Sequence, residues 1–514
     1  MARIDQVAKN AKFALLSQML LVIANFVVRR VFLMTLGEEY LGLSGLFTDI
    51  LSMLSMAELG FGTSIVFSLY KPLAQKDTEK IKSLMKLFRL AYRCVGLFIL
   101  TAGCALTPFL DFFVKEMPEE IPEAQIQVIY LLNVLNSGLS YFFIYKASLL
   151  FADQKKYVET IITAVAKLAA AGLQVGVLLL TGNYFLYLGI MIVATLGQNV
   201  MVSLQTNRMY PYLKEKMVRR LEQEDTRVLK KNVSANVLHK LGYLAVFSTD
   251  SILMAKLVSV SIVGIYSNYM LVRKALQNVI ELLFVSISAS MGNVNACESL
   301  EKKYEAYSHV YFFAAWLFGF ICICLMVLYN PFITLWLGKE YLLSDDTVFL
   351  IVLNFYMYCM RIPVGNTKEA MGLFWNDRYK PIAEVLINLG ASIFLGRRLG
   401  IQGILLGTLI STVTVPFWVE PYILYKHGLK KRLREYYKHY FWYLAVTVAT
   451  WAATAGVCSL VSSGPGGFLA KLFLCALIPN LIYTLVYFRT EEFAYLWEVG
   501  LRMAYRLLKK GDKS

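Results

Sequence analysis

The sequence predicts an all-α, polytopic membrane protein with about 14 transmembrane helices, and three observations lead to that prediction. The first is composition: 58% of the 514 residues are apolar, the mean hydropathy is +0.55 and only 17% of the residues are charged. The second is that apolar blocks of about 20 residues, the length needed to cross a bilayer core, recur along the whole chain. The third is that lysine and arginine concentrate in alternate connections between these blocks.

The apolar blocks predict helices, in chain order, at residues 13–36, 43–70, 85–107, 128–151, 158–180, 185–204, 233–256, 260–288, 306–328, 347–367, 379–397, 401–425, 438–461 and 468–488. The first block continues past Arg29 and Arg30 without a small-residue cleavage site, which predicts a retained helix and not a removed signal peptide. Connections as short as Thr181–Tyr184 and Ser462–Gly467 predict tight helical hairpins.

The distribution of basic residues orients the chain with both its N-terminus and its C-terminus in the cytoplasm. The connection 205–231 and the run Lys430–Arg434 are the strongest cytoplasmic markers, whereas the outer connection 108–127 holds five acids against Lys115 alone. The segment 489–514 interleaves apolar and basic residues, which predicts an amphipathic helix that lies on the cytoplasmic surface and contacts anionic lipid. A frayed charged tail is the alternative for this segment.

Several kinds of chemistry are excluded by the sequence. The formal charge of +16 follows the membrane topology and forms no separate basic domain, so no nucleic-acid partner is predicted. The eight cysteines form no CxxC pair and the four histidines lack metal-binding spacing, so neither a metal nor a cofactor is predicted. No Walker A sequence occurs, and the longest stretch outside the predicted helices, 205–232, is too short for a catalytic domain. The protein is therefore predicted not to be an enzyme.

A weak internal repeat relates the two halves of the sequence. Gly42 pairs with Gly264 and Phe47 with Tyr269 at one offset. Because six crossings return the chain to its starting side, this offset maps the first six helices onto the next six in the same orientation. Chance similarity between apolar segments is the alternative explanation.

The repeat predicts the domain organisation. Residues 1–231 would form an N-lobe with helices 1–6, and residues 232–430 a C-lobe with helices 7–12. Residues 431–514 would add helices 13 and 14 and the amphipathic tail. Two such six-helix bundles predict a transporter whose substrate binds near mid-membrane in a cavity between the lobes.

Charged side chains inside the predicted helices are the candidates for function. Nine cations lie there: Arg29, Arg30, Arg93, Lys146, Lys167, Lys240, Arg273, Lys274 and Arg361. They are accompanied by six acids: Asp49, Glu58, Asp250, Glu281, Glu384 and Glu420. A charge that faces lipid near the midplane costs about 2.5–3.5 kcal/mol, so these side chains must reach the surface, pair, or face a wet interior. The lysines at 146, 167 and 240 lie near cytoplasmic helix ends and are expected to reach the surface.

Five arginines are the candidate substrate-binding residues: Arg29, Arg30, Arg93, Arg273 and Arg361. Glu58, Asp250 and Glu281 are candidate counter-ions or coupling residues, and the two glutamates occupy matching places in the two halves. The deep arginines either line a solvated cavity or form structural ion pairs between helices, and the sequence leaves both interpretations open. In a cavity, guanidinium groups would hold the phosphate oxygens of an anionic cargo, such as a lipid-linked sugar with a diphosphate.

Six stretches carry a resemblance to a known superfamily: Leu41–Phe47, Ala57–Gly62, Ser68–Leu73, Phe247–Asp250, Val263–Tyr269 and Leu335–Gly338. With its helix count, twin bundles and arginine-bearing first helix, the chain resembles the multidrug/oligosaccharidyl-lipid/polysaccharide flippase superfamily, specifically its bacterial polysaccharide transporter branch. The resemblance implies two six-helix bundles in a V shape whose cavity cations hold the cargo's diphosphate. Arg29 or Arg30 would match the family's cationic first helix, whereas the other three arginines are assigned from their depth alone.

The resemblance implies a flippase that moves an undecaprenyl-diphosphate-linked oligosaccharide repeat unit to the outer leaflet of the bacterial plasma membrane for surface polysaccharide synthesis. Its partners would be the polyprenyl-diphosphate-linked glycan, a polysaccharide polymerase and glycosyltransferases. Two alternatives come from the same superfamily. A flippase for lipid II, the cell-wall precursor, is one, because those siblings also have fourteen helices. A cation-coupled multidrug exporter is the other, although its cavity would need acids for cationic drugs.

Overall fold

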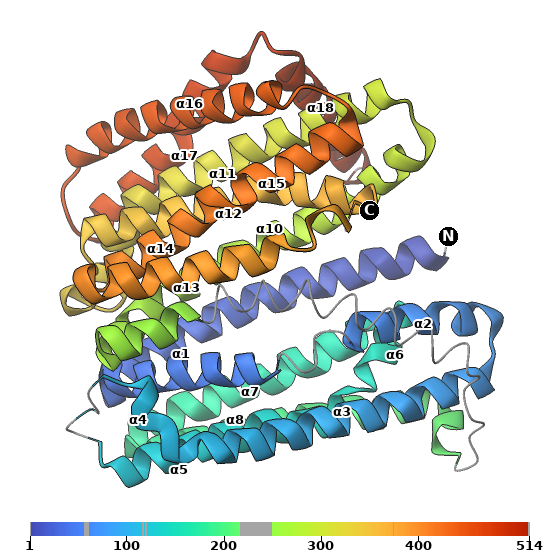
Figure 1. The fold of residues 1–514 in the computed structure, drawn as a ribbon, viewed down its shortest axis with the longest axis vertical. Coiled ribbons are helices and arrows are strands. Elements are labelled where there is room, and N and C mark those ends of the chain that lie inside the picture. The colour runs from blue at the N-terminus through green and yellow to red at the C-terminus, as the bar shows by residue number, and fades with distance from the viewer. Residues whose placement is uncertain are drawn as a thin grey trace. The chain divides into compact units, whose positions relative to one another are not determined.

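The structure, a computed structural model, describes residues 2–55, 61–115, 118, 121–215, 249–373 and 375–511. Within these ranges every regular element is a helix and no strand occurs, which confirms the predicted all-α class (Figure 1). Ten helices in the described part are long and apolar enough to cross a membrane. The chain is therefore a polytopic membrane protein, as its composition predicts.

Two compact units make up the chain, Met1–Ser267 and Asn268–Ser514. The division falls inside helix α10 (Val260–Cys297), so the first residues of that helix belong to the first unit. The predicted lobe boundary at 231–232 lies within 216–248, outside the described residues, and stays a prediction. Of the predicted helix 233–256, residues 249–256 are described and are helical.

In the first unit the structure describes α1 (Ala2–Leu54), α2 (Phe61–Gln75), α3 (Thr78–Leu106), η2 (Thr107–Phe109), α4 (Leu110–Phe113), α5 (Glu123–Ile144), α6 (Ala147–Ala152), α7 (Lys156–Thr181), α8 (Tyr184–Met209), η3 (Pro211–Lys214), a helical stretch at 249–257 and the start of α10. α1 packs against α7, α7 against α8, α8 against α5 and α5 against α3 (Figure 1). Gly182 ends α7 with a left-handed φ of 60°, and the side chain of Asn183 accepts hydrogen bonds from the first N–H groups of α8. A left-handed glycine followed by an asparagine N-cap accounts for the predicted tight hairpin.

α1 contains the first predicted helix and the start of the second. The chain turns at Gly37, where φ is 82° and ψ is −179°, a conformation that only glycine adopts without steric cost. The predicted helix 13–36 lies before this turn, and the predicted helix 43–70 corresponds to the end of α1 together with α2. Residues 56–60 between them, including Glu58, lie outside the described residues.

α1 and α10 cross closely at the two glycines that the internal repeat pairs. A methyl group on Gly42 would lie 2.0 Å from the carbonyl oxygen of Val260, and one on Gly264 would lie 2.2 Å from the carbonyl oxygen of Glu38. Both distances are far inside van der Waals contact, so the backbones approach this closely only because both residues lack a Cβ atom. The matched glycines of the repeat therefore form the two sides of one helix crossing.

The second unit contains the rest of α10, α11 (Leu300–Trp336), η4 (Lys339–Tyr341), α12 (Asp345–Ala370), η5 (Trp375–Asp377), α13 (Lys380–Leu399), α14 (Ile401–Thr414), α15 (Pro416–Ile423), the π-helix η6 (Leu424–Leu429), α16 (Leu433–Ser459), α17 (Pro465–Tyr487) and α18 (Glu491–Gly511). α11 is central, because α12, α16, α17 and α18 all pack against it. The predicted helix 401–425 is divided at Pro416, which has no backbone N–H to continue α14 and begins α15 instead.

The C-terminal segment forms the helix α18, as predicted, and the frayed-tail alternative is wrong for residues 491–511. Aromatic residues attach this helix to α11. The ring of Tyr495 stacks on His309 with ring centres 4.0 Å apart, and Phe493 stacks on Trp316 at 5.8 Å. The basic amphipathic tail is therefore fastened to the bundle as well as being suited to a lipid surface.

Gly42→Ala is expected to destabilise the first unit, because the new methyl group would meet the carbonyl oxygen of Val260. Overpacking of this kind costs about 1–3 kcal/mol, which thermal unfolding of the detergent-solubilised protein would report as a lower midpoint. Gly176→Ala in α7 is the matched control, because no atom lies within 4 Å of its added methyl group. Equal midpoints for the two variants would contradict the close crossing of α1 and α10.

Candidate functional site

Arg29 and Arg30 are neighbours on α1, but their surroundings differ. Arg29 is half-buried, and its Nη1 donates a hydrogen bond to Oγ of Ser267 at 2.7 Å. Ser267 in turn donates to the carbonyl oxygen of Gly264 at 2.7 Å, beside the glycine crossing. Arg30 is exposed. Sequence reasoning did not identify Ser267, because no charge or spacing marks it, although it lies in one of the stretches that carry the family resemblance.

The remaining predicted arginines lie on three other helices. Arg93 is exposed on α3. Arg273 on α10 is half-buried, and its guanidinium carbon lies 5.8 Å from the centre of the Phe355 ring, which is a cation–π contact. Arg361 on α12 bonds to carboxylates.

The three predicted acids have separate environments. Glu58 lies outside the described residues, and Asp250 is buried in the helical stretch that precedes α10. Glu281 is exposed on α10 and accepts a hydrogen bond from Nε2 of Gln277 at 2.9 Å. The described contacts of Glu281 do not include an arginine, so its predicted counter-ion role stays a prediction.

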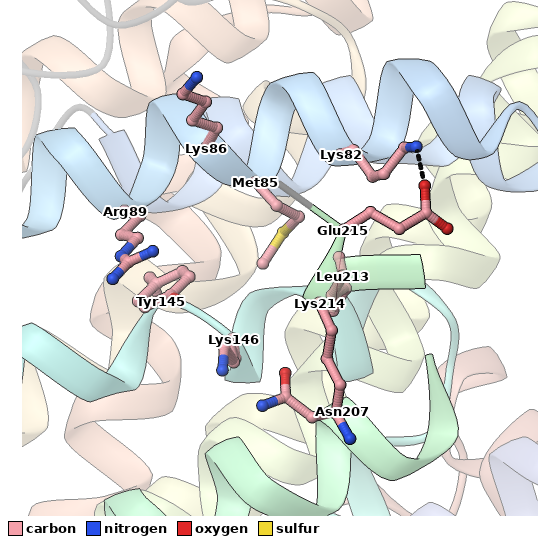
Figure 2. Close-up of a pocket in the computed structure, with 10 residues that line it drawn as sticks. All are labelled: Lys82, Met85, Lys86, Arg89, Tyr145, Lys146, Asn207, Leu213, Lys214 and Glu215. Carbon is pink, nitrogen blue, oxygen red and sulfur yellow. Dashed lines mark hydrogen bonds and ion pairs between the residues drawn. The ribbon is translucent and has the colours of Figure 1, made fainter. Parts of the chain in front are cut away.

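A cavity of about 540 Å³ opens in the first unit (Figure 2). It lies between α3, the junction of α5 with α6, the end of α8 and the turn η3. Its described lining includes one acid, Glu215, and five cations: Lys82, Lys86, Arg89, Lys146 and Lys214. This excess of positive charge suits an anionic ligand.

Ionic and hydrogen-bonded contacts hold the walls of this cavity in place. The buried Lys82 forms ion pairs with Glu79 and, at 2.6 Å, with Glu215. The hydroxyl of Tyr210, at the start of η3, donates to Asp153 at 2.5 Å. Burial and this hydrogen bond raise the pKa of Tyr210, so the phenol keeps its proton and remains a donor. The segment that follows α8 is thereby tied to both α3 and α6.

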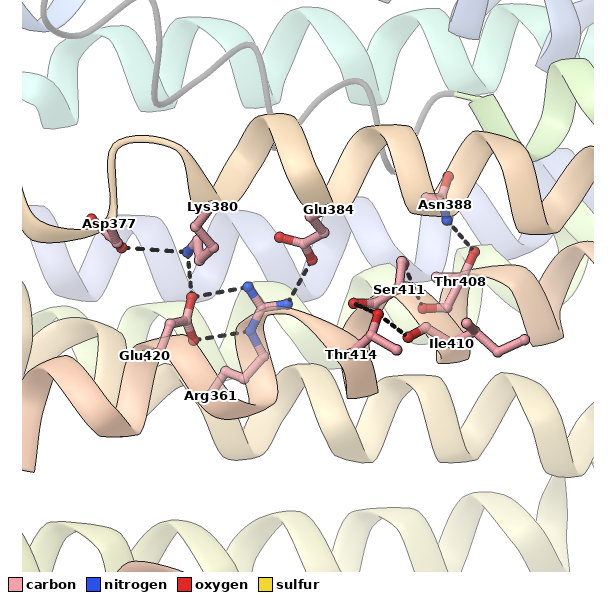
Figure 3. Close-up of polar contacts among 10 residues, drawn as sticks. All are labelled: Arg361, Asp377, Lys380, Glu384, Asn388, Thr408, Ile410, Ser411, Thr414 and Glu420. Carbon is pink, nitrogen blue, oxygen red and sulfur yellow. Dashed lines mark hydrogen bonds and ion pairs between the residues drawn. The ribbon is translucent and has the colours of Figure 1, made fainter.

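Arg361 is the centre of a buried ion-pair cluster in the second unit (Figure 3). Its Nε and Nη2 donate to the two carboxylate oxygens of Glu420 at 3.1 and 3.0 Å, and its Nη1 donates to Glu384 at 3.1 Å. The two carboxylates are only 6% and 10% exposed. One guanidinium therefore ties α12 to α13 and α15, with the bidentate geometry that offsets the cost of burying charge.

Three more charges extend this cluster along the connection between α12 and α13. Lys380 forms ion pairs with Glu420 and, at 3.6 Å, with Asp377 (Figure 3). Asp377 also pairs with Lys368. The six side chains are three cations and three anions, so the cluster as a whole is neutral. The sequence marks the arginine and both glutamates as intramembrane charges. It gives no sign of the other three, because charges at helix ends are common.

Close packing of α13 on α14 positions Glu384. A methyl group on Gly403 would lie 2.1 Å from a backbone oxygen of α13, and one on Gly407 would lie 2.2 Å from a hydroxyl oxygen of that helix. Two glycines four residues apart are typical of close helix pairs in membranes. One turn after Glu384, Asn388 donates to Oγ1 of Thr408 at 3.0 Å (Figure 3).

Little space is open beside this cluster. The cavity next to Arg361 and Glu420 has a volume of about 10 Å³, roughly the minimum for one water molecule. Proline and aromatic side chains close it: Pro416, Phe417, Pro421, Tyr436 and Tyr440. The surroundings of Arg361 fit the structural ion-pair interpretation that the sequence leaves open for the deep arginines.

Arg361→Ala is expected to lower the free energy of unfolding by about 3 kcal/mol, because it leaves buried carboxylates without their guanidinium partner. Thermal unfolding in detergent and abundance in the membrane both measure this loss. The double variant Arg361→Gln with Glu420→Gln removes both charges and is expected to recover part of it. Normal stability of Arg361→Ala combined with lost transport would instead assign Arg361 to substrate binding.

No known family model matches the sequence, and no curated protein matches it either. Solved structures match its fold. The lipid II flippase MurJ, in an inward closed conformation, matches with a TM-score of 0.64 and 13% identity, over 92% of this chain and 98% of that chain. An inward-facing multidrug resistance MATE-family transporter of the MOP superfamily matches with a TM-score of 0.60 and 13% identity, over 82% and 99%. The MATE transporter VcmN of Vibrio cholerae matches with a TM-score of 0.55 and 12% identity, over 83% and 99%. The chain therefore shares its fold with a lipid II flippase and with multidrug transporters of the MATE family.

Proposed function

We propose that the protein is a flippase that moves an undecaprenyl-diphosphate-linked oligosaccharide across a bacterial plasma membrane, with both chain ends in the cytoplasm. The cargo would be supplied by glycosyltransferases on the cytoplasmic side and consumed by a polymerase on the outer side, for surface polysaccharide synthesis. Such a protein makes and breaks no covalent bond. It needs a cationic binding site that opens alternately to the two sides of the membrane.

The fold supports transport as the general function. A lipid II flippase and multidrug transporters share it over at least 82% of this chain. The intramembrane charges support an anionic cargo, because they lean basic and include arginines, whose planar fork matches phosphate oxygens. A diphosphate offers several such oxygens at one end of an otherwise apolar lipid.

The observation that carries the proposal is the placement of Arg29 compared with Arg361. Arg361 bonds to carboxylates, which neutralise its charge, whereas Nη1 of Arg29 bonds to the neutral hydroxyl of Ser267. This contact places a guanidinium N–H against a neutral oxygen, and we propose that phosphate oxygens of the cargo bond to the same guanidinium. One described contact of Arg273 is likewise with an uncharged group, the ring of Phe355.

Arg29 and Arg273, which are both half-buried, are the first candidates for binding the diphosphate. Arg30 and Arg93 are exposed and would contribute long-range attraction. Arg361 would bind cargo only by exchanging a carboxylate for a phosphate. Asp250 and Glu281 remain candidates for coupling, as does Glu58.

Lipid II is the alternative cargo, and one observation favours it. The lipid II flippase structure matches 92% of this chain, against 82% and 83% for the two multidrug transporters. Lipid II also carries a polyprenyl diphosphate, so the same arginines would serve it. A cation-coupled multidrug exporter has the same fold but would use acids such as Asp250 for cationic drugs.

Arg29→Ala is expected to slow cargo transfer about ten- to hundredfold, because a hydrogen bond to a charged group contributes about 1.5–3 kcal/mol. The assay is movement of a fluorescent undecaprenyl-diphosphate disaccharide between the leaflets of proteoliposomes, followed with a membrane-impermeant quencher. Arg29→Lys should be less impaired, since the charge survives although the fork is lost.

Arg30→Ala is the matched control, because it removes the same charge from the adjacent, exposed position. Parallel assays with lipid II and with a cationic dye distinguish the three cargoes. Wild-type transfer rates in the Arg29→Ala variant, or extrusion of the dye alone, would overturn the proposed function.

A further inference from the structure

The beginning of α3 carries a stripe of basic residues. Lys82, Lys86, Arg89 and Arg93 are separated by four, three and four residues, which places them within about 60° of one another around the helix. The first three line the cavity of about 540 Å³. Arg93 lies close to the same wall, because it and Arg89 both act electrostatically on Tyr145.

Two further cations reach the cavity from other segments. Lys146 lies between α5 and α6, and Lys214 ends the turn η3 after α8. In Figure 2 the side chains of Arg89, Lys146 and Lys214 come from three different segments, whereas Lys86 extends away from them. The cationic surface is therefore assembled by the tertiary fold and is not the face of one helix.

The charges in this cavity are mostly uncompensated within the described part of the chain. Lys82 pairs with Glu215, the acid of the lining. No ion pair among the described residues involves Lys86, Arg89, Lys146 or Lys214. The described hydrogen bond of Lys146 goes to the hydroxyl of Ser203, at 2.8 Å. Like charges gathered in this way repel one another, so an anion that bonds to several of them would stabilise the unit.

We propose that this cavity binds a phosphate-bearing group, and that the group belongs to an anionic membrane lipid. A phosphate offers several acceptor oxygens at once to Arg89, Lys146 and Lys214. A volume of about 540 Å³ is within the range of small-molecule sites, about 300–1,000 Å³. Met85 and Leu213, which also line the cavity, supply apolar contact for the lipid beside its headgroup.

The position of the cavity favours a lipid as the source of the phosphate. α3 begins there, and α5 and α8 end there, so the cavity lies at one end of the first unit. The basic connections predict this end to face the cytoplasm, where anionic headgroups attract lysine and arginine by about 1 kcal/mol each. A bound headgroup would brace α3 against the segment that follows α8. The site contains neither Arg29 nor Arg273, so it is separate from the proposed cargo site.

The test uses the full-length protein and two probes. Phosphatidylglycerol retained by the protein in detergent is counted by native mass spectrometry, with phosphatidylcholine as the uncharged comparison, and thermal midpoints are measured with each lipid. Inorganic diphosphate at the same concentration forms the second arm. The expected result is selective retention of phosphatidylglycerol and a raised midpoint. An equal or larger effect of diphosphate would overturn the lipid as the source, and no effect of either probe would overturn the site.

Variants locate the binding. Arg89→Gln with Lys146→Gln is expected to bind phosphatidylglycerol at least tenfold more weakly, whereas Arg89→Lys with Lys146→Arg keeps both charges and most of the affinity. Lys167→Gln removes an exposed cation of α7, outside the cavity, and is expected to bind as the wild type does. Unchanged affinity in the neutral double variant would overturn the proposal.

Stability separates a ligand site from a structural role. In phosphate-free detergent the neutral double variant should unfold at the wild-type temperature or above it, because like charges have been removed. A large fall in its midpoint without ligand would show that Arg89 and Lys146 support the fold, and would also overturn the proposal. Cargo transfer by the wild-type protein does not enter this test, so its outcome is independent of the proposed function.

Discussion

The bidentate pair of hydrogen bonds between Arg361 and Glu420 is the interaction on which the second unit depends, because it offsets the cost of burying charge in a low-dielectric interior. Glu384 pairs with Arg361, and Lys380 pairs with the buried Glu420. These ion pairs hold α12, α13 and α15 together. The same constraint gives different results in the first unit. There Arg29 bonds to a hydroxyl, and the basic residues of α3 gather around a cavity.

Much of the fold follows from the sequence alone, because crossing a bilayer requires long apolar helices and leaves few alternatives. The helices of the described part lie where the apolar blocks predict them, and the turn at 181–184 is marked by glycine and asparagine. The length of the apolar block 401–425 predicts one helix, whereas Pro416 divides it into α14 and α15. The repeat relates Gly42 to Gly264, but it does not reveal that the two glycines lie at the same helix crossing.

The candidate sites were less predictable. The sequence marks which residues are charged and deep, but it cannot say which partner each one meets, since Arg361 and Glu420 are 59 residues apart. Nothing in the sequence distinguishes Ser267 from other serines, because its hydrogen bond from Arg29 depends on how α1 packs against α10. The sequence does not reveal the basic cavity, because its lysines fall near helix ends, where the positive-inside rule already explains them. The half-buried position of Lys146 and its convergence with cations of other segments, and not its residue type, distinguish it from other lysines near helix ends.

The corner at Gly37 has a mechanical meaning. The two helical segments of α1 meet there through a single residue, and no atom lies within 4 Å of the position that a Cβ atom would take. A change in the angle between these two helical segments would require only the φ and ψ torsions of Gly37 to change. The second segment is held in place a few residues later by the close contact at Gly42. A residue with free torsions, Gly37, is therefore followed closely by a tightly packed one, Gly42. A small rotation about the torsions of Gly37 would therefore displace the N-terminal end of α1 much farther than the residues next to the glycine.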